Sequence, residues 1–171
     1  HLAITGDIAL DDAKLLVETH FSNWQPGEVL RFKSPKLLRQ RKTRIYLTDR
    51  PDSVQSVIRV TNNINLKSGD NDLYSAVVMN TLLGGGTFRL YQNLREKNGF
   101  TYGVYSSLRP DRWIGNFSID LSTESSLTQK SIQAILFELN RIRNEKVSSE
   151  ELQLVKNYLT GQFSLSLENP S

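Results

Sequence analysis

Cysteine is absent from this chain of 171 residues, which excludes disulfide bonds and cysteine-based zinc sites. No run of eighteen apolar residues occurs, so the sequence contains no candidate for a membrane-spanning helix. An excess of charge of one sign is also lacking, because 21 lysines and arginines are offset by 18 aspartates and glutamates, giving a net charge of +3. The length and composition fit a single domain with a substantial core.

Histidine is scarce, and this limits the metal chemistry that the chain can perform. A zinc hydrolase needs three protein ligands and a general base beside the metal-bound water. The only histidines are His1 and His20. His20 lies two residues from Glu18, so the two side chains would face different sides of a helix. We therefore expect a structural or surface role for His20 and no metal site in this chain.

The positive charge is concentrated most densely between Arg39 and Arg44. No aromatic platform for stacking bases adjoins this run, so we interpret it as a solvated linker rather than a nucleic-acid contact. The mild positive charge is the only feature that supports a free-standing nucleic-acid or small-molecule binder. The N-terminus lacks an initiator methionine and a signal-peptide pattern, and the strand pattern is present from its first residues. We therefore expect the chain to be a fragment of a longer protein.

Periodicity and turn residues predict an alternation of short strands and helices. The expected order is a strand over residues 1–8, a helix from Asp11 or Asp12 to Trp24, strands over 42–49 and 53–62 that pair as a hairpin or flank each other in one sheet, a helix from Asp70 or Asn71 to the glycines at 84–86, a helix over 87–98, strands over 100–108 and 113–121, and two final helices. This order favours an α+β fold, with helices packed on one face of a mostly antiparallel sheet.

Two of these elements have specific patterns. The strand over 113–121 alternates between apolar and polar side chains. One face holds Trp113, Phe117, Ile119 and Leu121, and the other holds Asn116, Ser118, Asp120 and Ser122. We therefore expect one face to be buried and the other to be exposed to solvent. Ser148 and Glu151 have the spacing of a capping box at the start of the last helix. The predicted core face of that helix consists of Leu152, Val155, Leu159 and Phe163.

The stretch from Leu83 to Tyr105 holds the residues best suited to chemistry. The glycines Gly84, Gly85 and Gly86 interrupt helical structure, since each costs about 1 kcal/mol in a helix interior. The next helix ends at Gly99, the residue type that helices prefer just past their end. Arg95 thus lies in its last turn and Tyr102 early in the following strand. Both could offer hydrogen-bond donors to one face of a cleft. On spacing alone, however, the ordinary explanations are that Arg95 complements the helix dipole and that Tyr102 packs in its strand.

This stretch also identifies a family. The sequence LLGGGTFRLYQNLREKNGFTYGVYS closely resembles the signature of the C-terminal-type domain of M16 metallopeptidases, the pitrilysin, insulinase and processing-peptidase family. In that family a helix end supplies an arginine and the next strand a tyrosine seven residues later, and Arg95 and Tyr102 match that pair. The resemblance covers nearly all of residues 1–171, which we expect to form one such domain. It implies the two-layer LuxS/MPP-like metallohydrolase fold.

The resemblance also implies a function. Two such domains of the family face each other around a chamber; one brings zinc on a His-x-x-Glu-His helix, and the other holds the peptide substrate with the arginine and tyrosine. This chain lacks that zinc motif, so we expect it to be the substrate-binding, zinc-free half and to be inactive alone. Zinc is expected in the partner domain, on the same chain or another. The alternative is an inactive M16-like domain that only assembles. The most similar members are exported bacterial proteins, which favours the periplasm.

The three glycines allow two readings of their own. A phosphate-binding loop would follow a strand and carry a GxxxxGK[ST] or GxGxxG pattern. Here a helix precedes Gly84 and no lysine follows at the required position. In the resembling family this segment is a mobile turn that borders the chamber and lets backbone approach closely, and we favour that reading for Gly84–Gly86.

Overall fold

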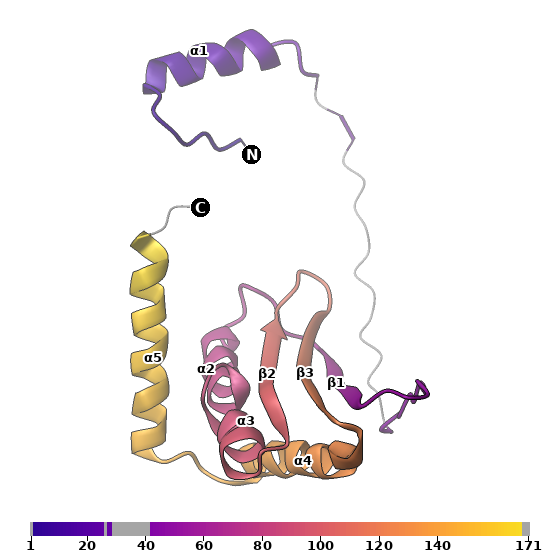
Figure 1. Ribbon diagram of the computed structural model, residues 1–171. Helices are drawn as coiled ribbons and strands as arrows, with labels where there is room; N and C mark the ends of the chain where they lie inside the picture. The colour runs from indigo at the N-terminus through magenta and orange to yellow at the C-terminus, as the bar shows by residue number, and fades with distance from the viewer. Residues whose placement is uncertain (1, 26, 29–41, 169–171) are drawn as a thin grey trace. The chain divides into compact units, whose positions relative to one another are not determined.

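A computed structural model describes residues 2–25, 27–28 and 42–168 (Figure 1). The chain divides into two compact units, His1–Lys33 and Ser34–Ser171. The second unit contains all the strands described and all the predicted site residues.

The first unit contains one helix, α1 (Leu10–Phe21). Asp11 and Asp12 lie inside its first turn, where carboxylates complement the helix dipole, and Ala9 occupies the cap position without a side-chain hydrogen bond. The strand predicted over residues 1–8 is wrong for the described residues 2–8, which are not in a strand. A strand needs a neighbour for its backbone N–H and C=O groups, and no strand is described within residues 2–28.

Three strands form the antiparallel sheet of the second unit: β1 (Gln55–Ile64), β2 (Thr101–Arg109) and β3 (Gly115–Glu124). Their order is β1-β3-β2, so the central strand β3 pairs with both neighbours (Figure 1). Ser56 of β1 and Thr101 of β2 both pair with Thr123. Strands β1 and β2 therefore begin at the same end of the sheet.

The two faces of the sheet differ as the alternation in β3 predicts. Ile119 and Leu121 are buried, whereas Ser122 is exposed and the Asp120 carboxylate reaches solvent. The predicted strand is confirmed with shifted bounds, since it begins at Gly115 rather than at Trp113. One face of the sheet thus forms the core and the other is open to solvent.

Helices cover the buried face. They are α2 (Leu73–Gly84), α3 (Arg89–Tyr91), which continues into the π-helical turn η1 (Gln92–Lys97), and α4 (Thr128–Asn144), which follows the 3₁₀ turn η2 (Ser125–Leu127). The core cluster joins these helices to all three strands and contains Ile58, Leu83, Leu90, Leu94, Val104, Ile119, Leu121 and Ile135. The α+β class with two layers, helices on one face of an antiparallel sheet, is confirmed.

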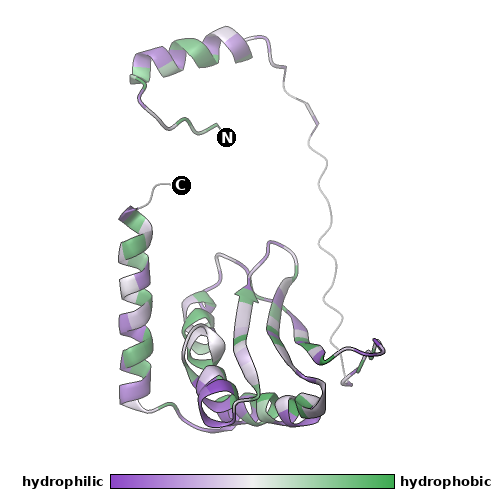
Figure 2. Cartoon of the chain, in the orientation of Figure 1, coloured by the Kyte–Doolittle hydropathy of each residue, from purple (hydrophilic) through white to green (hydrophobic). Residues whose placement is uncertain are grey.

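The last helix, α5 (Ser149–Glu168), begins at the predicted cap, since the Glu151 backbone N–H donates to Ser148 Oγ at 3.2 Å. The other half of the predicted capping box does not form, because the Glu151 carboxylate accepts hydrogen bonds from Arg89 instead. Val155 is buried and the helix packs against α2. The prediction that Phe163 is in the core is wrong, because its side chain is 64% exposed. Figure 2 shows hydrophobic residues continuing along α5 toward its C-terminal end, but within the described residues 42–168 of the second unit no surface covers that end.

The strand predicted over residues 42–49 is also wrong. These residues are not in a strand, and Ile45, Tyr46 and Leu47 are largely exposed. The turn after them does form, since the Ser53 N–H donates to the Arg50 carbonyl oxygen at 3.2 Å and Asp52 adopts a φ of 64°. The chain before this turn does not run back along β1. The predicted strand therefore lacks the hydrogen-bonding neighbour that would stabilise it.

Candidate functional site

The candidate site lies where the α3–η1 helix passes into β2. The helix predicted over residues 87–98 is shorter, and its second part is a π-helical turn over Gln92–Lys97, a local geometry that is frequent at functional sites. Gly99 ends it in the left-handed region, at a φ of 62°. The Phe100 N–H then donates to the Leu94 carbonyl oxygen at 2.7 Å. This tight reversal returns the chain beside the last helical turn before β2 begins.

The reversal brings the two predicted site residues into contact. Arg95 Cζ lies over the Tyr102 ring, 4.6 Å from its centroid. The same atom lies 4.9 Å from the centroid of the Tyr91 ring. Both distances are within the range of a cation–π interaction, which contributes about 0.5–1 kcal/mol at exposed positions. Tyr91 was not among the residues predicted for the site, although its position four residues before Arg95 on a helix is the signal that would have found it.

The contacting groups are open to solvent. Tyr102 is 86% exposed, and Arg95 is half-buried. The guanidinium carries five N–H donors, and within residues 42–168 its side chain makes no hydrogen bond or ion pair that would occupy them. The site therefore presents a fixed cation and a phenol hydroxyl on an accessible surface.

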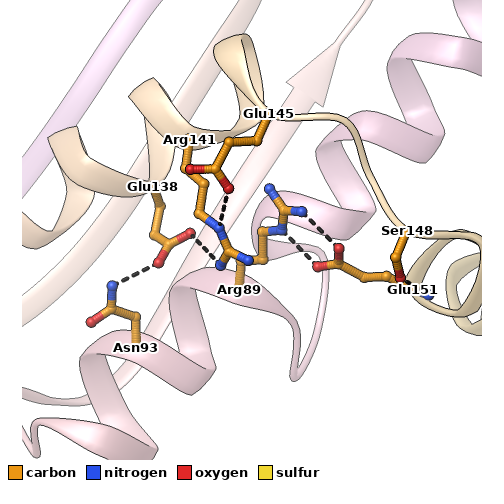
Figure 3. Close-up of polar contacts among 7 residues, drawn as sticks. All are labelled: Arg89, Asn93, Glu138, Arg141, Glu145, Ser148 and Glu151. Carbon is orange, nitrogen blue, oxygen red and sulfur yellow. Dashed lines mark hydrogen bonds and ion pairs between the residues drawn. The ribbon is translucent and has the colours of Figure 1, made fainter.

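A buried ion pair holds the helix that carries Arg95. Arg89, only 4% exposed, donates from Nε and Nη2 to the two carboxylate oxygens of Glu151 at 2.6 and 2.7 Å (Figure 3). Such two-point pairing fixes direction as well as distance. The pair joins the start of α3 to the first turn of α5.

A second polar cluster joins η1 to α4. Asn93 Nδ2 donates to Glu138 Oε1 at 2.7 Å, and Arg141 Nη1 lies 3.6 Å from Glu138 Oε2 (Figure 3). Arg141 Nε also donates to Glu145 at 3.0 Å. Glu138 is buried, so the amide and the cation compensate a charge that would otherwise be costly. The α3–η1 helix is thus attached to two further helices as well as to the sheet.

The hydrogen bonds from Arg89 hold the pKa of Glu151 below its ordinary value of 4.5, against the opposing effect of burial. A carboxylate with a lowered folded-state pKa stabilises the fold above its unfolded-state pKa and loses this contribution as the pH falls through the folded-state value. The pair therefore contributes fully at neutral pH and is lost only in acid.

We expect Glu151→Gln to destabilise the domain at pH 7, and we expect its difference from the unsubstituted chain to shrink as the pH falls below about 4.5. Urea unfolding of both proteins between pH 8 and pH 3 measures this. Glu96→Gln, at an exposed carboxylate on η1, is the matched control. A stability difference that stays constant down to pH 3 would show that the charge of Glu151 is not the cause.

Close packing explains why positions 84–86 are glycine. A Cβ atom at Gly84 would lie 2.8 Å from Leu90 Cδ1 and 3.0 Å from the Ser106 backbone nitrogen, and one at Gly86 would lie 3.3 Å from Tyr158 Oη. A Cβ at Gly85 would meet Thr81 Cα at 2.6 Å. Backbone atoms of β2 and of α2 itself therefore exclude a side chain at Gly84 and Gly85, whereas one at Gly86 would require the Tyr158 ring to shift by a few tenths of an ångström. The role of Gly84–Gly86 as a turn bordering a substrate chamber stays a prediction.

Metal ligands do not gather in the described ranges 2–25, 27–28 and 42–168, where no three His, Cys, Asp or Glu side chains come together as a metal site. His20 is exposed on α1. In the same ranges no helix is long and apolar enough to cross a bilayer.

Comparison with known proteins gives one family. The model of the family described as "Peptidase M16 inactive domain" matches residues 1–159. The uncharacterized zinc protease YmxG of Bacillus subtilis is 31% identical over 105 residues, which are 61% of this chain and 26% of that protein. The uncharacterized zinc protease SCO5738 of Streptomyces coelicolor is 30% identical over 101 residues, covering 58% and 22%. The chain therefore spans about a quarter of the length of these relatives.

Solved structures agree with this match. A peptidase M16 inactive domain from Pseudomonas fluorescens is 29% identical, with a TM-score of 0.61 over 64% of this chain and 27% of that one. A protease from Helicobacter pylori has a TM-score of 0.80 over 96% of this chain and 40% of that one. At 15% identity the second structure supports the fold alone.

Proposed function

The chain belongs to the peptidase M16 family, as a domain of its inactive type, and from this premise we propose that it is the substrate-binding, zinc-free half of a zinc metalloendopeptidase. Its substrates in this proposal are peptides or unfolded segments, held in a chamber between paired domains. Residues 1–171 would form one domain of a longer chain. The zinc-bearing domain would lie elsewhere on that chain or on a separate subunit.

The observation that carries the proposal is the contact between Arg95 and Tyr102 on an exposed surface. A peptide carbonyl accepts hydrogen bonds, and its oxygen becomes more negative as the bond is attacked. A fixed guanidinium and a phenol hydroxyl are suited to hold that oxygen or a neighbouring carbonyl, because they need no reorganisation as the charge develops. The cation–π contact and the reversal at Gly99 supply the fixed position.

The part of the chain that the structure describes offers no ligand set for zinc. Zinc, when bound, supplies an activated water and polarises the carbonyl that is cleaved. In the proposal the partner domain holds that zinc. Arg95 and Tyr102 bind and orient the peptide backbone from the opposite side.

A second candidate function is assembly without catalysis. Leu136 and Phe137 on α4, and Phe163 on α5, are each more than half exposed. Such residues are typical of surfaces that a partner covers. A pure scaffold would need these contacts but would gain nothing from Arg95 and Tyr102 as a pair.

Reconstitution tests the proposal. We expect the purified chain to cleave no peptide, with or without added zinc. Together with the zinc-bearing domain of the same protein or operon, it should cleave unstructured peptides, and a chelator should abolish this activity until zinc is restored. Fluorogenic peptides measure the rate. A complex that forms but cleaves nothing at saturating zinc would favour the assembly function instead.

A further inference from the structure

Strand β2 contains one extra residue close to the Arg95–Tyr102 contact. Thr101 pairs with Thr123 and Val104 with Leu121. Three residue steps on β2 therefore oppose two on β3, which defines a β-bulge at Tyr102 and Gly103. Bulges redirect side chains and are frequent beside active sites.

The bulge decides which side chains share a face. In a regular strand, residues three apart point to opposite faces. Here Thr101 and Val104 both point into the core, at 8% and 0% exposure, whereas Tyr102 and Tyr105 are 86% and 62% exposed. The extra residue thus places Tyr105 on the same open face as Tyr102.

Gly103 brings the Tyr105 ring back toward the site. A Cβ atom on Gly103 would lie 3.1 Å from Tyr105 Oη and 3.3 Å from Tyr105 Cε2. The phenol end of Tyr105 therefore lies over the residue next to Tyr102. A side chain at position 103 would require that ring to shift by a few tenths of an ångström.

The charges next to Tyr105 are already compensated. Its cross-strand partner Asp120 forms an ion pair with Arg59 and accepts a hydrogen bond from Ser118 Oγ at 3.0 Å. Val57, 82% exposed, lies on β1 at the register of Ser122 on the same face. Around Tyr105 the open face of the sheet thus presents an aromatic ring and, across β3, an aliphatic side chain, and the Asp120 charge between them is already paired.

We propose that Tyr105 is a specificity-determining residue that provides a platform for an apolar or aromatic side chain of the bound peptide. This inference rests on the proposed function. Arg95 and Tyr102 hold the peptide backbone, and the neighbouring side chain packs on the Tyr105 ring. Gly103 is a positioning residue, because its lack of a side chain leaves room for the Tyr105 ring.

The test uses the assembled enzyme and a series of peptides that carry Phe, Leu or Ala at each position around the cleavage site. We expect the effect at one of these positions. There, Tyr105→Ser should lower kcat/KM for the peptides with Phe or Leu roughly 3- to 10-fold relative to kcat/KM for the peptide with Ala. Tyr105→Phe should keep the preference. Gly103→Ala should weaken it by displacing the ring, and circular dichroism checks that the fold is kept. Tyr74→Ser, at an 80% exposed tyrosine on α2, is the matched control and should change nothing.

The selectivity ratio separates this role from a structural one, because a destabilised domain would lower cleavage of all peptides alike. If Tyr105→Ser leaves the ratio unchanged while Arg95→Ala lowers cleavage of every peptide, the inference about Tyr105 is overturned and the proposed function stands. If Arg95→Ala also has no effect on any peptide, both are overturned.

Discussion

Arg95→Ala is expected to lower kcat/KM of the assembled peptidase about 10²- to 10³-fold, the loss typical of removing one preorganised donor to a developing oxyanion. The domain should keep its fold, since Arg95 is half-buried and lies outside the core cluster. Steady-state kinetics on an unstructured peptide measures the loss. Lys97→Ala removes a cation from an exposed position on the same turn and should change the rate little.

Tyr102→Phe separates the hydroxyl from the ring. It keeps the aromatic surface that lies against Arg95, so a loss of activity in this variant is due to the hydroxyl. Tyr102→Leu removes both and should be slower still, because Arg95 then loses one of its two neighbouring rings. Unchanged turnover in both Arg95→Ala and Tyr102→Phe would refute the assignment of substrate binding to this pair.

Arg89→Met is expected to destabilise the domain strongly. It leaves the Glu151 carboxylate without the cation that its two oxygens contact. Breaking a buried ion pair costs about 3–5 kcal/mol, and the lower end applies because the Glu151 side chain is still 28% exposed. Urea unfolding of the purified chain measures the change in the free energy of unfolding.

Two further variants identify the cause. Arg89→Met combined with Glu151→Leu removes both charges, and should recover much of the loss because no unpaired carboxylate is left. Arg59→Met breaks an ion pair whose arginine side chain is 72% exposed, and should cost at most about 1 kcal/mol. Equal costs for Arg89→Met and Arg59→Met, or a double variant as unstable as Arg89→Met, would contradict a stabilising role for the buried pair.

Local patterns predicted much of the second unit. The alternation around Ile119 determined which face of β3 is buried, and Ser148 with Glu151 determined where α5 begins. The helix end at Gly99 was also readable, because only a residue that tolerates positive φ suits that position. Because the chain reverses at Gly99, the sequence also predicted that Arg95 and Tyr102 lie close together.

Other features were outside the reach of local patterns. The strand predictions failed for the described residues 2–8 and for residues 42–49, because a sequence can favour extended backbone without providing the neighbour that pairs with it. Phe163 has the spacing of a core residue, yet burial also needs a surface opposite the helix. The π-helical turn that carries Arg95 has no signature in residue spacing.

The sequence by itself determined the family and the α+β class and predicted that Arg95 lies close to Tyr102, because these depend on residue type and on spacing along a short stretch. The tertiary structure decided the rest. Tyr105 reached the face of Tyr102 through one extra residue in β2, which only the pairing with β3 defines, and Arg89 pairs with Glu151, 62 positions away. Such contacts arise only when distant segments pack together, since the free energy that selects them comes from burying and pairing groups that no local pattern connects.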